Sequence, residues 1–219
     1  MPAPSSPLAS PLTHLLYLHG FRSSPKSMKA QIVAQCMAEH RPAVRLWCPQ
    51  LPPSPSEAMA LIEEGTADWP RNSSAVIGSS LGGFYATVVA ERMGWPAVLL
   101  NPAVEPARDL AAYIGKNTAW HGNDEFYFKP AYVDELGALR PAAITRPARY
   151  LAVIAKGDEV LDWREMSARY AGACQTVLEG SDHALSEFAE LWPAVREFLG
   201  IAHDGVQAAK GERNGQSPH

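Results

Sequence analysis

The sequence lacks the features that mark membrane, secreted and nucleic-acid-binding proteins. No apolar run among its 219 residues approaches the roughly 20 residues that cross a bilayer. No basic run is longer than a pair of residues, and the net charge of -4 gives no general attraction to nucleic acid or to an anionic membrane surface. The first residues show neither the basic nor the apolar segment of a signal peptide. We therefore expect a cytoplasmic protein without nucleic-acid or membrane partners.

Disulfide, metal and nucleotide motifs are also missing. The three cysteines are odd in number, widely spaced and form no CxxC pair, so we expect small buried thiols in a reducing compartment. The seven histidines show no HxxxH spacing, which leaves no evident metal-ligand cluster. No GxGxxG follows the first predicted strand and no GxxxxGK[ST] occurs. The prediction is a protein with no metal and no cofactor.

Short apolar runs alternate with amphipathic segments along most of the chain. This pattern predicts βα units around a parallel sheet with helices on both faces. Residues 1–11, rich in Pro, Ser and Ala, and the polar residues 203–219 are predicted to be disordered tails around one domain, residues 12–202. Pro193 predicts a kink or break in the last helix. The predicted strands are 15–18, 44–47, 75–78, 97–100, 150–154 and 175–178, and the predicted helices are 27–39, 56–68, 81–93, 162–170 and 184–199.

One interval, residues 101–147, is far longer than a simple crossover between strands requires. It contains predicted helices near 106–114 and 131–139, with an aromatic-rich stretch between them. We interpret it as a cap over the carboxyl ends of the strands. Its aromatic side chains could line an acyl or aryl pocket, or they could only pack the cap onto the sheet, and both readings stay open. These residues are Trp120, Phe126, Tyr127 and Phe128.

The most specific motif is Gly-Ser-Ser-Leu-Gly at residues 78–82. An apolar strand runs into it and a helix-forming segment follows, which is the context of a nucleophile elbow, a strained turn that lifts a serine hydroxyl clear of the sheet. Gly78 and Gly82 are small where the strand and helix backbones must approach closely. The Gly-x-Ser-x-Gly register selects Ser80 over Ser79 as the nucleophile.

A base and an acid follow that serine in the chain, each at the end of a predicted strand. His183 comes after the strand 175–178 and is the candidate general base. Asp158 comes after the strand 150–154 and is the favoured acid. Asp162 competes with it but suits a helix cap, Asp182 adjoins the histidine, and Glu159 ranks lower. The sequence therefore favours Asp158 as the acid without excluding the other three carboxylates.

Backbone N–H groups are predicted to hold the oxyanion. One is that of Leu81, directly after the nucleophile, and the other is that of Phe21 in the loop after the first strand. His19 in the same loop could be mistaken for a base, but we expect it to order the loop through side-chain hydrogen bonds.

Four motifs together carry a family resemblance: Tyr-Leu-His-Gly-Phe-Arg-Ser-Ser-Pro at 17–25, Gly-Ser-Ser-Leu-Gly-Gly at 78–83, Asn-Pro-Ala-Val at 101–104 and Gly-Asp-Glu-Val-Leu-Asp at 157–162, with Gly-Ser-Asp-His at 180–183 beside them. The chain resembles the α/β-hydrolase superfamily and, within it, the small bacterial YqiA-type (UPF0227) esterases. The resemblance implies hydrolysis of carboxylic esters or thioesters with Ser80, Asp158 and His183 as a triad. It also implies a three-layer fold with six parallel strands in the superfamily's order 4-3-5-6-7-8.

Two other readings are kept beside the ester or thioester hydrolase. One is a peptidase or acyltransferase on the same scaffold. The other is a non-catalytic binding module, which is disfavoured because every triad candidate is present. The expected partner is a small-molecule ester or thioester.

Overall fold

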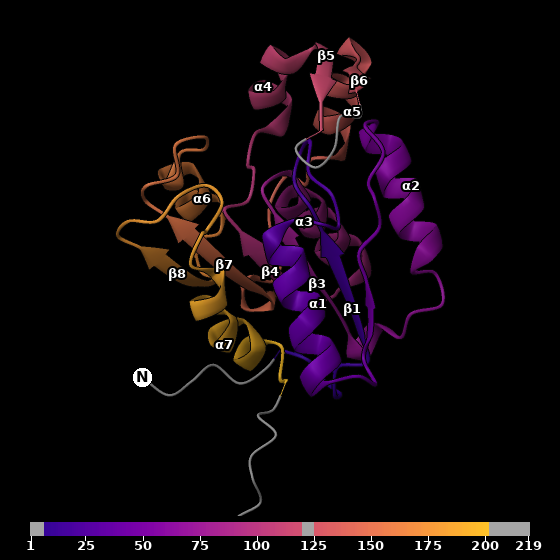
Figure 1. Cartoon of the computed structure of the whole chain (residues 1–219), viewed down its shortest axis with the longest axis vertical. Coiled ribbons are helices and arrows are strands. Elements are labelled where there is room, and N and C mark those ends of the chain that lie inside the picture. Colours follow the sequence, from indigo (N-terminus) through magenta and orange to yellow (C-terminus); the bar gives the residue numbers. More distant parts are fainter. Residues whose placement is uncertain (1–6, 120–124, 202–219) are drawn as a thin grey trace, which may run out of the picture.

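A six-stranded parallel sheet forms the centre of the computed structural model, which describes residues 7–119 and 125–201 (Figure 1). The strand order is β2-β1-β3-β4-β7-β8. The predicted order 4-3-5-6-7-8 uses the superfamily's strand numbers and describes the same arrangement, so the fold prediction is confirmed. Each of the six predicted strands is present. Their bounds are β1 His14–Leu18, β2 Arg45–Trp47, β3 Ser74–Ser79, β4 Ala97–Leu100, β7 Tyr150–Ala155 and β8 Cys174–Leu178.

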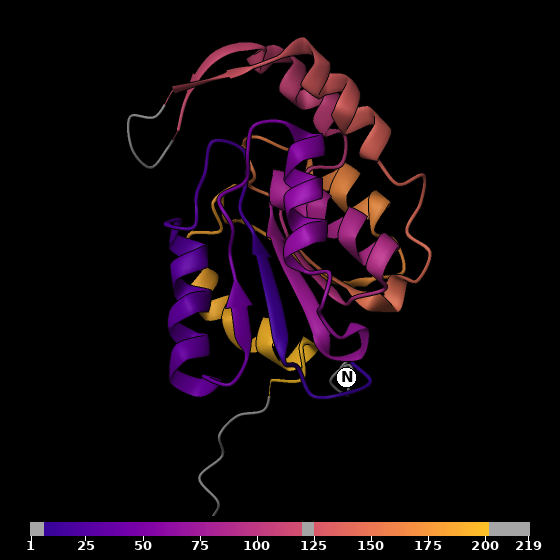
Figure 2. The same ribbon diagram turned by 90° about the vertical axis from the view of Figure 1, so that its right-hand side faces the viewer.

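Helices cover both faces of the sheet, which gives three layers (Figure 2). The strands alternate between two apolar clusters: Leu15 and Tyr17 of β1 pack with the α1 and α7 side, while Leu16 and Leu18 pack with the α2 and α3 side. Burial on both faces explains why all six residues of β3 and of β7 are buried. The helices are α1 Met28–His40, α2 Pro55–Gly65, α3 Leu81–Met93, α6 Trp163–Arg169 and α7 Phe188–Phe198.

Two local expectations were wrong, and half of a third. The last helix begins at Phe188 instead of residue 184, because the Asp182 side chain accepts hydrogen bonds from the Ser186 N–H and hydroxyl and holds a turn there. Of the kink or break predicted at Pro193, the break is absent, since the helix continues through Pro193 with Trp192 and Val195 buried on either side. The three cysteines are free, as expected, but partly exposed instead of buried.

The cap lies above the carboxyl ends of the strands (Figure 2). It contains α4 Pro106–Leu110, a 3₁₀ turn Ala111–Tyr113, the antiparallel strands β5 Gly115–Thr118 and β6 Glu125–Phe128, and α5 Pro130–Leu139. Both cap helices were predicted, but the hairpin was missed because Gly-Lys-Asn-Thr in β5 has no apolar alternation. Trp120 and most of the predicted tails lie outside the described residues.

Within the described ranges, no helix is both long and apolar enough to cross a membrane.

Candidate active site

Ser80 occupies a strained turn between β3 and α3. Its backbone has φ 56° and ψ −120°, a conformation that residues with a side chain rarely adopt. The turn is held from the neighbouring strand, because the Ser80 N–H donates to the Leu100 carbonyl at 2.9 Å and the Ala103 N–H donates to the Ser80 carbonyl at 3.0 Å. The strand-turn-helix geometry is that of a nucleophile elbow.

Two glycines make this turn possible. A Cβ atom on Gly78 would lie 2.1 Å from the Gly82 carbonyl oxygen, and one on Gly82 would lie 2.0 Å from the Leu18 carbonyl oxygen. Real Cβ atoms do not approach backbone so closely, so a larger residue would force α3 away from the sheet.

Gly82→Ala should therefore lower the free energy of unfolding by about 3 kcal/mol, because the backbone must move to relieve the overlap. The matched control is Gly137→Ala in α5, where an added Cβ meets nothing within 4 Å. That variant should gain about 0.5–1 kcal/mol from the better helix former. Urea unfolding of both variants checks the pair, and equal effects would contradict the close-packing argument.

A continuous chain of hydrogen bonds joins the three predicted triad residues. His183 Nε2 lies 3.0 Å from Ser80 Oγ, and His183 Nδ1 lies 2.8 Å from Asp158 Oδ2. The Asp158 side chain is fully buried, and its other oxygen accepts the N–H groups of Val160 and Leu161, both at 2.8 Å. A carboxylate in this position favours the proton on Nδ1, which leaves Nε2 to accept the serine proton.

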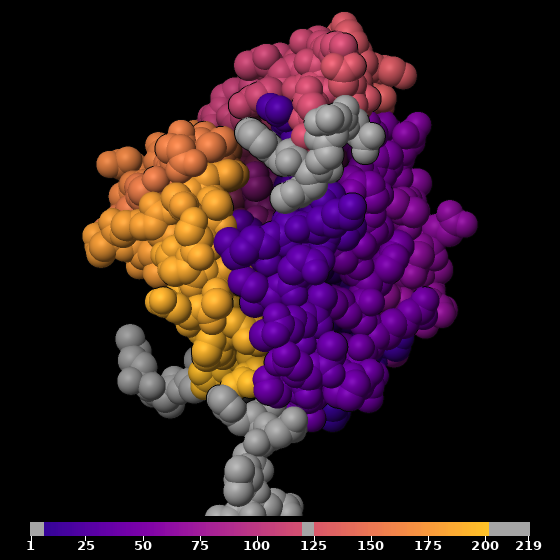
Figure 3. Space-filling model, viewed as in Figure 1, coloured from indigo at the N-terminus to yellow at the C-terminus, as the bar shows by residue number. Residues whose placement is uncertain are grey.

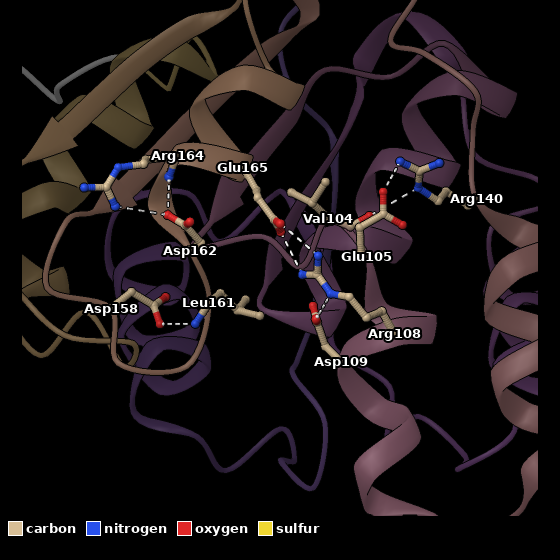
Figure 4. A network of polar contacts seen from close by, with 10 residues as sticks. All are labelled: Val104, Glu105, Arg108, Asp109, Arg140, Asp158, Leu161, Asp162, Arg164 and Glu165. Carbon is tan, nitrogen blue, oxygen red and sulfur yellow. Dashed lines mark hydrogen bonds and ion pairs between the residues drawn. The ribbon is translucent and has the colours of Figure 1, made fainter.

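The competing carboxylates have other partners. Asp162 caps α6 by accepting the Arg164 N–H at 2.9 Å, as the sequence suggested (Figure 4). Hydrogen bonds from Ser186 hold the pKa of Asp182 below its usual value. Glu159 accepts the backbone N–H of His183 at 3.0 Å, so it contacts the histidine's main chain and not its ring. Only Asp158 among these four meets the imidazole.

The loop after β1 passes directly over the elbow. A Cβ on Gly20 would lie 3.2 Å from Ser80 Cβ, so a glycine lets the backbone come close. In the described part of the chain, neither the Phe21 N–H nor the Leu81 N–H donates a hydrogen bond, which leaves both predicted oxyanion donors available. His19 is buried, with Nε2 accepting the Leu51 N–H at 3.1 Å and Nδ1 placed 3.0 Å from the Gly20 carbonyl. It ties two loops together, as expected.

The predicted aromatic residues of the cap hairpin pack around this loop and do not line the cavities beside Ser80. The Phe21 ring makes edge contacts with Tyr113, Phe126 and Phe128 at centroid distances of 5.5, 5.8 and 5.3 Å. Phe128 is buried and Tyr127 is 58% exposed, and neither lines those cavities. Phe126 lines a separate cavity beneath the hairpin. For Phe128 the structure therefore favours the packing reading.

One ion pair joins the cap to α6 of the sheet domain, and two more lie within the cap (Figure 4). Arg108 of α4 donates two hydrogen bonds of 2.8 Å to the Glu165 carboxylate of α6, and a third of 2.7 Å to Asp109. The bidentate contact with Arg108 lowers the pKa of Glu165. Arg140, directly after α5, pairs with Glu105, directly before α4. The first contact thus joins α4 to α6, and the second joins the two cap helices at their ends.

Two cavities open onto Ser80 and His183. One, of about 280 Å³, is walled mainly by apolar side chains. Besides Leu81, a predicted oxyanion residue, these side chains come from the cap and the acid loop. The sequence did not predict them as pocket residues, because they are scattered along the chain: Ala103, Pro106, Leu110, Tyr113, Val160 and Leu161. Figure 3 shows a hollow in the surface below the cap, between the N-terminal part of the domain (indigo) and its C-terminal part (orange to yellow).

The second cavity, of about 450 Å³, also presents mostly apolar surface, but polar and charged residues are more frequent in its lining. Ser23, Ser27, Lys29 and Glu159 line it beside Ser80 and His183. Burial lowers the pKa of Lys29 to about 8, and its ammonium group donates to the Ala184 carbonyl. In the described residues, no group of three or more His, Cys, Asp or Glu side chains could hold a metal ion.

Comparison with known proteins identifies the family of the chain. The model of an uncharacterised protein family, UPF0227, matches residues 14–200. The chain belongs to this family.

Solved structures show that its fold is that of the α/β hydrolases. Est1E from Butyrivibrio proteoclasticus, in complex with ferulic acid, superposes with a TM-score of 0.64 at 17% identity, covering 87% of this chain and 88% of that one. Mouse alpha/beta hydrolase domain-containing protein 10 gives 0.63 at 13% identity, covering 86% and 89%. An esterase domain from Rhodothermus marinus gives 0.59 at 18% identity, covering 88% and 90%. At sequence identities this low, the likeness shows a shared fold and does not extend to activity or substrate.

Proposed function

We propose that this protein is a serine hydrolase that cleaves carboxylic esters or acyl thioesters through an acyl-enzyme. The observation that carries the proposal is the hydrogen-bonded chain from buried Asp158 through His183 to Ser80, whose hydroxyl opens onto both cavities. A buried carboxylate, an oriented imidazole and a strained serine are the parts that acyl transfer requires.

In the acylation step, Ser80 Oγ attacks the carbonyl carbon while its proton passes to His183 Nε2. The carbonyl oxygen takes the negative charge and receives hydrogen bonds from the N–H groups of Phe21 and Leu81. The C–O or C–S bond then breaks, and the alcohol or thiol leaves with the proton from His183. Asp158 orients the imidazole and stabilises its charged form.

In the deacylation step, His183 takes a proton from water, and the resulting hydroxide attacks the acyl-serine carbonyl. The bond to Ser80 Oγ breaks, the carboxylic acid is released, and His183 returns the proton to the serine. No metal or cofactor enters either step.

The walls of the cavities suggest where the two halves of a substrate lie. The cavity of about 280 Å³ suits an acyl or aryl group, because it is walled by side chains such as Leu110 and Tyr113. The larger cavity then takes the alcohol or thiol portion, whose polar groups could contact Ser23, Ser27, Lys29 or Glu159. Est1E, which has a similar fold, binds ferulic acid, an aromatic carboxylic acid. We propose a small-molecule substrate and a cytoplasmic enzyme without nucleic-acid or membrane partners.

A fluorophosphonate probe tests the proposal directly. The folded protein should be labelled at Ser80, as read by peptide mass spectrometry, and should hydrolyse p-nitrophenyl esters or acyl thioesters. Heat-unfolded protein is the control and should not be labelled, because the reactivity of the serine depends on His183. If the folded protein is not labelled and hydrolyses no ester or thioester, the hydrolase proposal is wrong and a binding module is favoured.

A further inference from the structure

Asn101 links the elbow to the loop that carries His183. It follows β4 directly, is fully buried and has φ 42°, in the left-handed region that asparagine tolerates better than most residues. Its backbone N–H donates to the Val153 carbonyl at 2.9 Å, and its side-chain oxygen accepts the Ala155 N–H at 2.8 Å. These two bonds hold Asn101 against the end of β7.

The amide nitrogen of Asn101 reaches the histidine loop. It lies 3.0 Å from the Asp182 carbonyl oxygen and 3.3 Å from the His183 carbonyl oxygen. A flipped amide would place its oxygen against two carbonyls and its NH₂ against the Ala155 N–H, so the hydrogen-bond network permits one orientation. Every hydrogen-bonding group of the side chain is therefore used.

The histidine loop, residues 179–187, has little regular structure of its own. Ser181 and Leu185 have positive φ values of 68° and 50°. Its position depends on contacts from other elements, and Asn101 supplies the contact from β4. The residue before it, Leu100, accepts the backbone N–H of Ser80. Consecutive residues of one segment thus hold the nucleophile and the base.

We propose that Asn101 is a positioning residue that sets the distance and angle between His183 Nε2 and Ser80 Oγ. The inference rests on the proposed function of that pair. Asn101 does not line either cavity at Ser80, so it acts through the histidine loop and not on the substrate. Displacing a catalytic group by about 1 Å can cost about 100-fold in rate.

Two variants remove the contact in different ways. Asn101→Gly deletes the whole side chain but accepts the positive φ. Asn101→Asp keeps an acceptor for the Ala155 N–H and turns a carboxylate oxygen toward two carbonyls. The matched control is Gln175→Glu, because the Gln175 amide also donates to two backbone carbonyls, those of Ser167 and Tyr170, at 3.0 and 2.8 Å. Gln175 has no hydrogen bond to the elbow or the histidine loop in the described residues.

The experiment measures kcat and KM per folded molecule, together with the low-field NMR signal of the His183 Nδ1 proton. Both Asn101 variants should lower kcat by about 10- to 100-fold with KM nearly unchanged. They should also weaken the low-field signal, while Gln175→Glu leaves kcat and the signal as in the parent protein. Asn101 variants that lose thermal stability alone, or a control that loses kcat equally, would overturn the inference. If the parent protein neither reacts with a fluorophosphonate nor hydrolyses esters, the proposed function fails, and the NMR signal alone then decides whether Asn101 orients His183.

Discussion

Ser80→Ala should lower kcat/KM for p-nitrophenyl esters by about 10⁴- to 10⁶-fold, because no other hydroxyl occupies the apex of the elbow. Losses of this size follow removal of the nucleophile in serine hydrolases with a triad. The fold should persist, since the Ser80 side chain contributes one hydrogen bond, to His183. Steady-state kinetics and circular dichroism check the two parts. Retained turnover at the parent rate would show that another group attacks the carbonyl.

The strained backbone adds a second readout to the same position. Ser80 has φ 56°, which alanine tolerates poorly and glycine tolerates well. Ser80→Gly should be as inactive as Ser80→Ala, yet more stable to unfolding than the alanine variant by about 1 kcal/mol. Urea unfolding of the two inactive proteins separates strain from chemistry. An alanine variant as stable as the glycine variant would mean that the turn stores little strain.

Asp158→Asn should lower kcat by about 10⁴-fold, far more than Asp162→Asn. One oxygen of Asp158 accepts the N–H groups of Val160 and Leu161, so an amide placed there keeps its oxygen on them. Its NH₂ group must then face His183 Nδ1, which forces the ring proton onto Nε2. In that tautomer Nε2 cannot accept the serine proton.

Asp162→Asn is the matched comparison for this substitution. Asparagine caps helices about as well as aspartate, so the contact with the Arg164 N–H survives and activity should change by less than about threefold. The same p-nitrophenyl ester assay measures both variants. If Asp162→Asn costs more activity than Asp158→Asn, the acid is misassigned.

Local patterns of the sequence predict much of this architecture. Continuous apolar runs such as residues 97–100 predict buried parallel strands, and the bounds of β4 and α3 agree with the prediction residue for residue. The elbow is also local, because Gly-x-Ser-x-Gly after a strand is itself the structural unit. The cap hairpin was not predictable in the same way. Residues 115–118 pair with 125–128 through backbone hydrogen bonds, which do not depend on the type of side chain. The sequence of β5 therefore shows no apolar alternation from which a strand could be predicted.

The sequence by itself determined the fold, the candidate nucleophile and a short choice of bases and acids, because each depends on residues close together in the chain. Tertiary structure alone decided that Asp158, and not Asp162, Asp182 or Glu159, meets the His183 ring. It also decided that Phe128 packs against Phe21 and that Asn101 reaches the histidine loop. These contacts join residues that lie 25 to more than 100 positions apart. Such pairs are brought together by the order of the strands in the sheet, which places the loops at their carboxyl ends side by side.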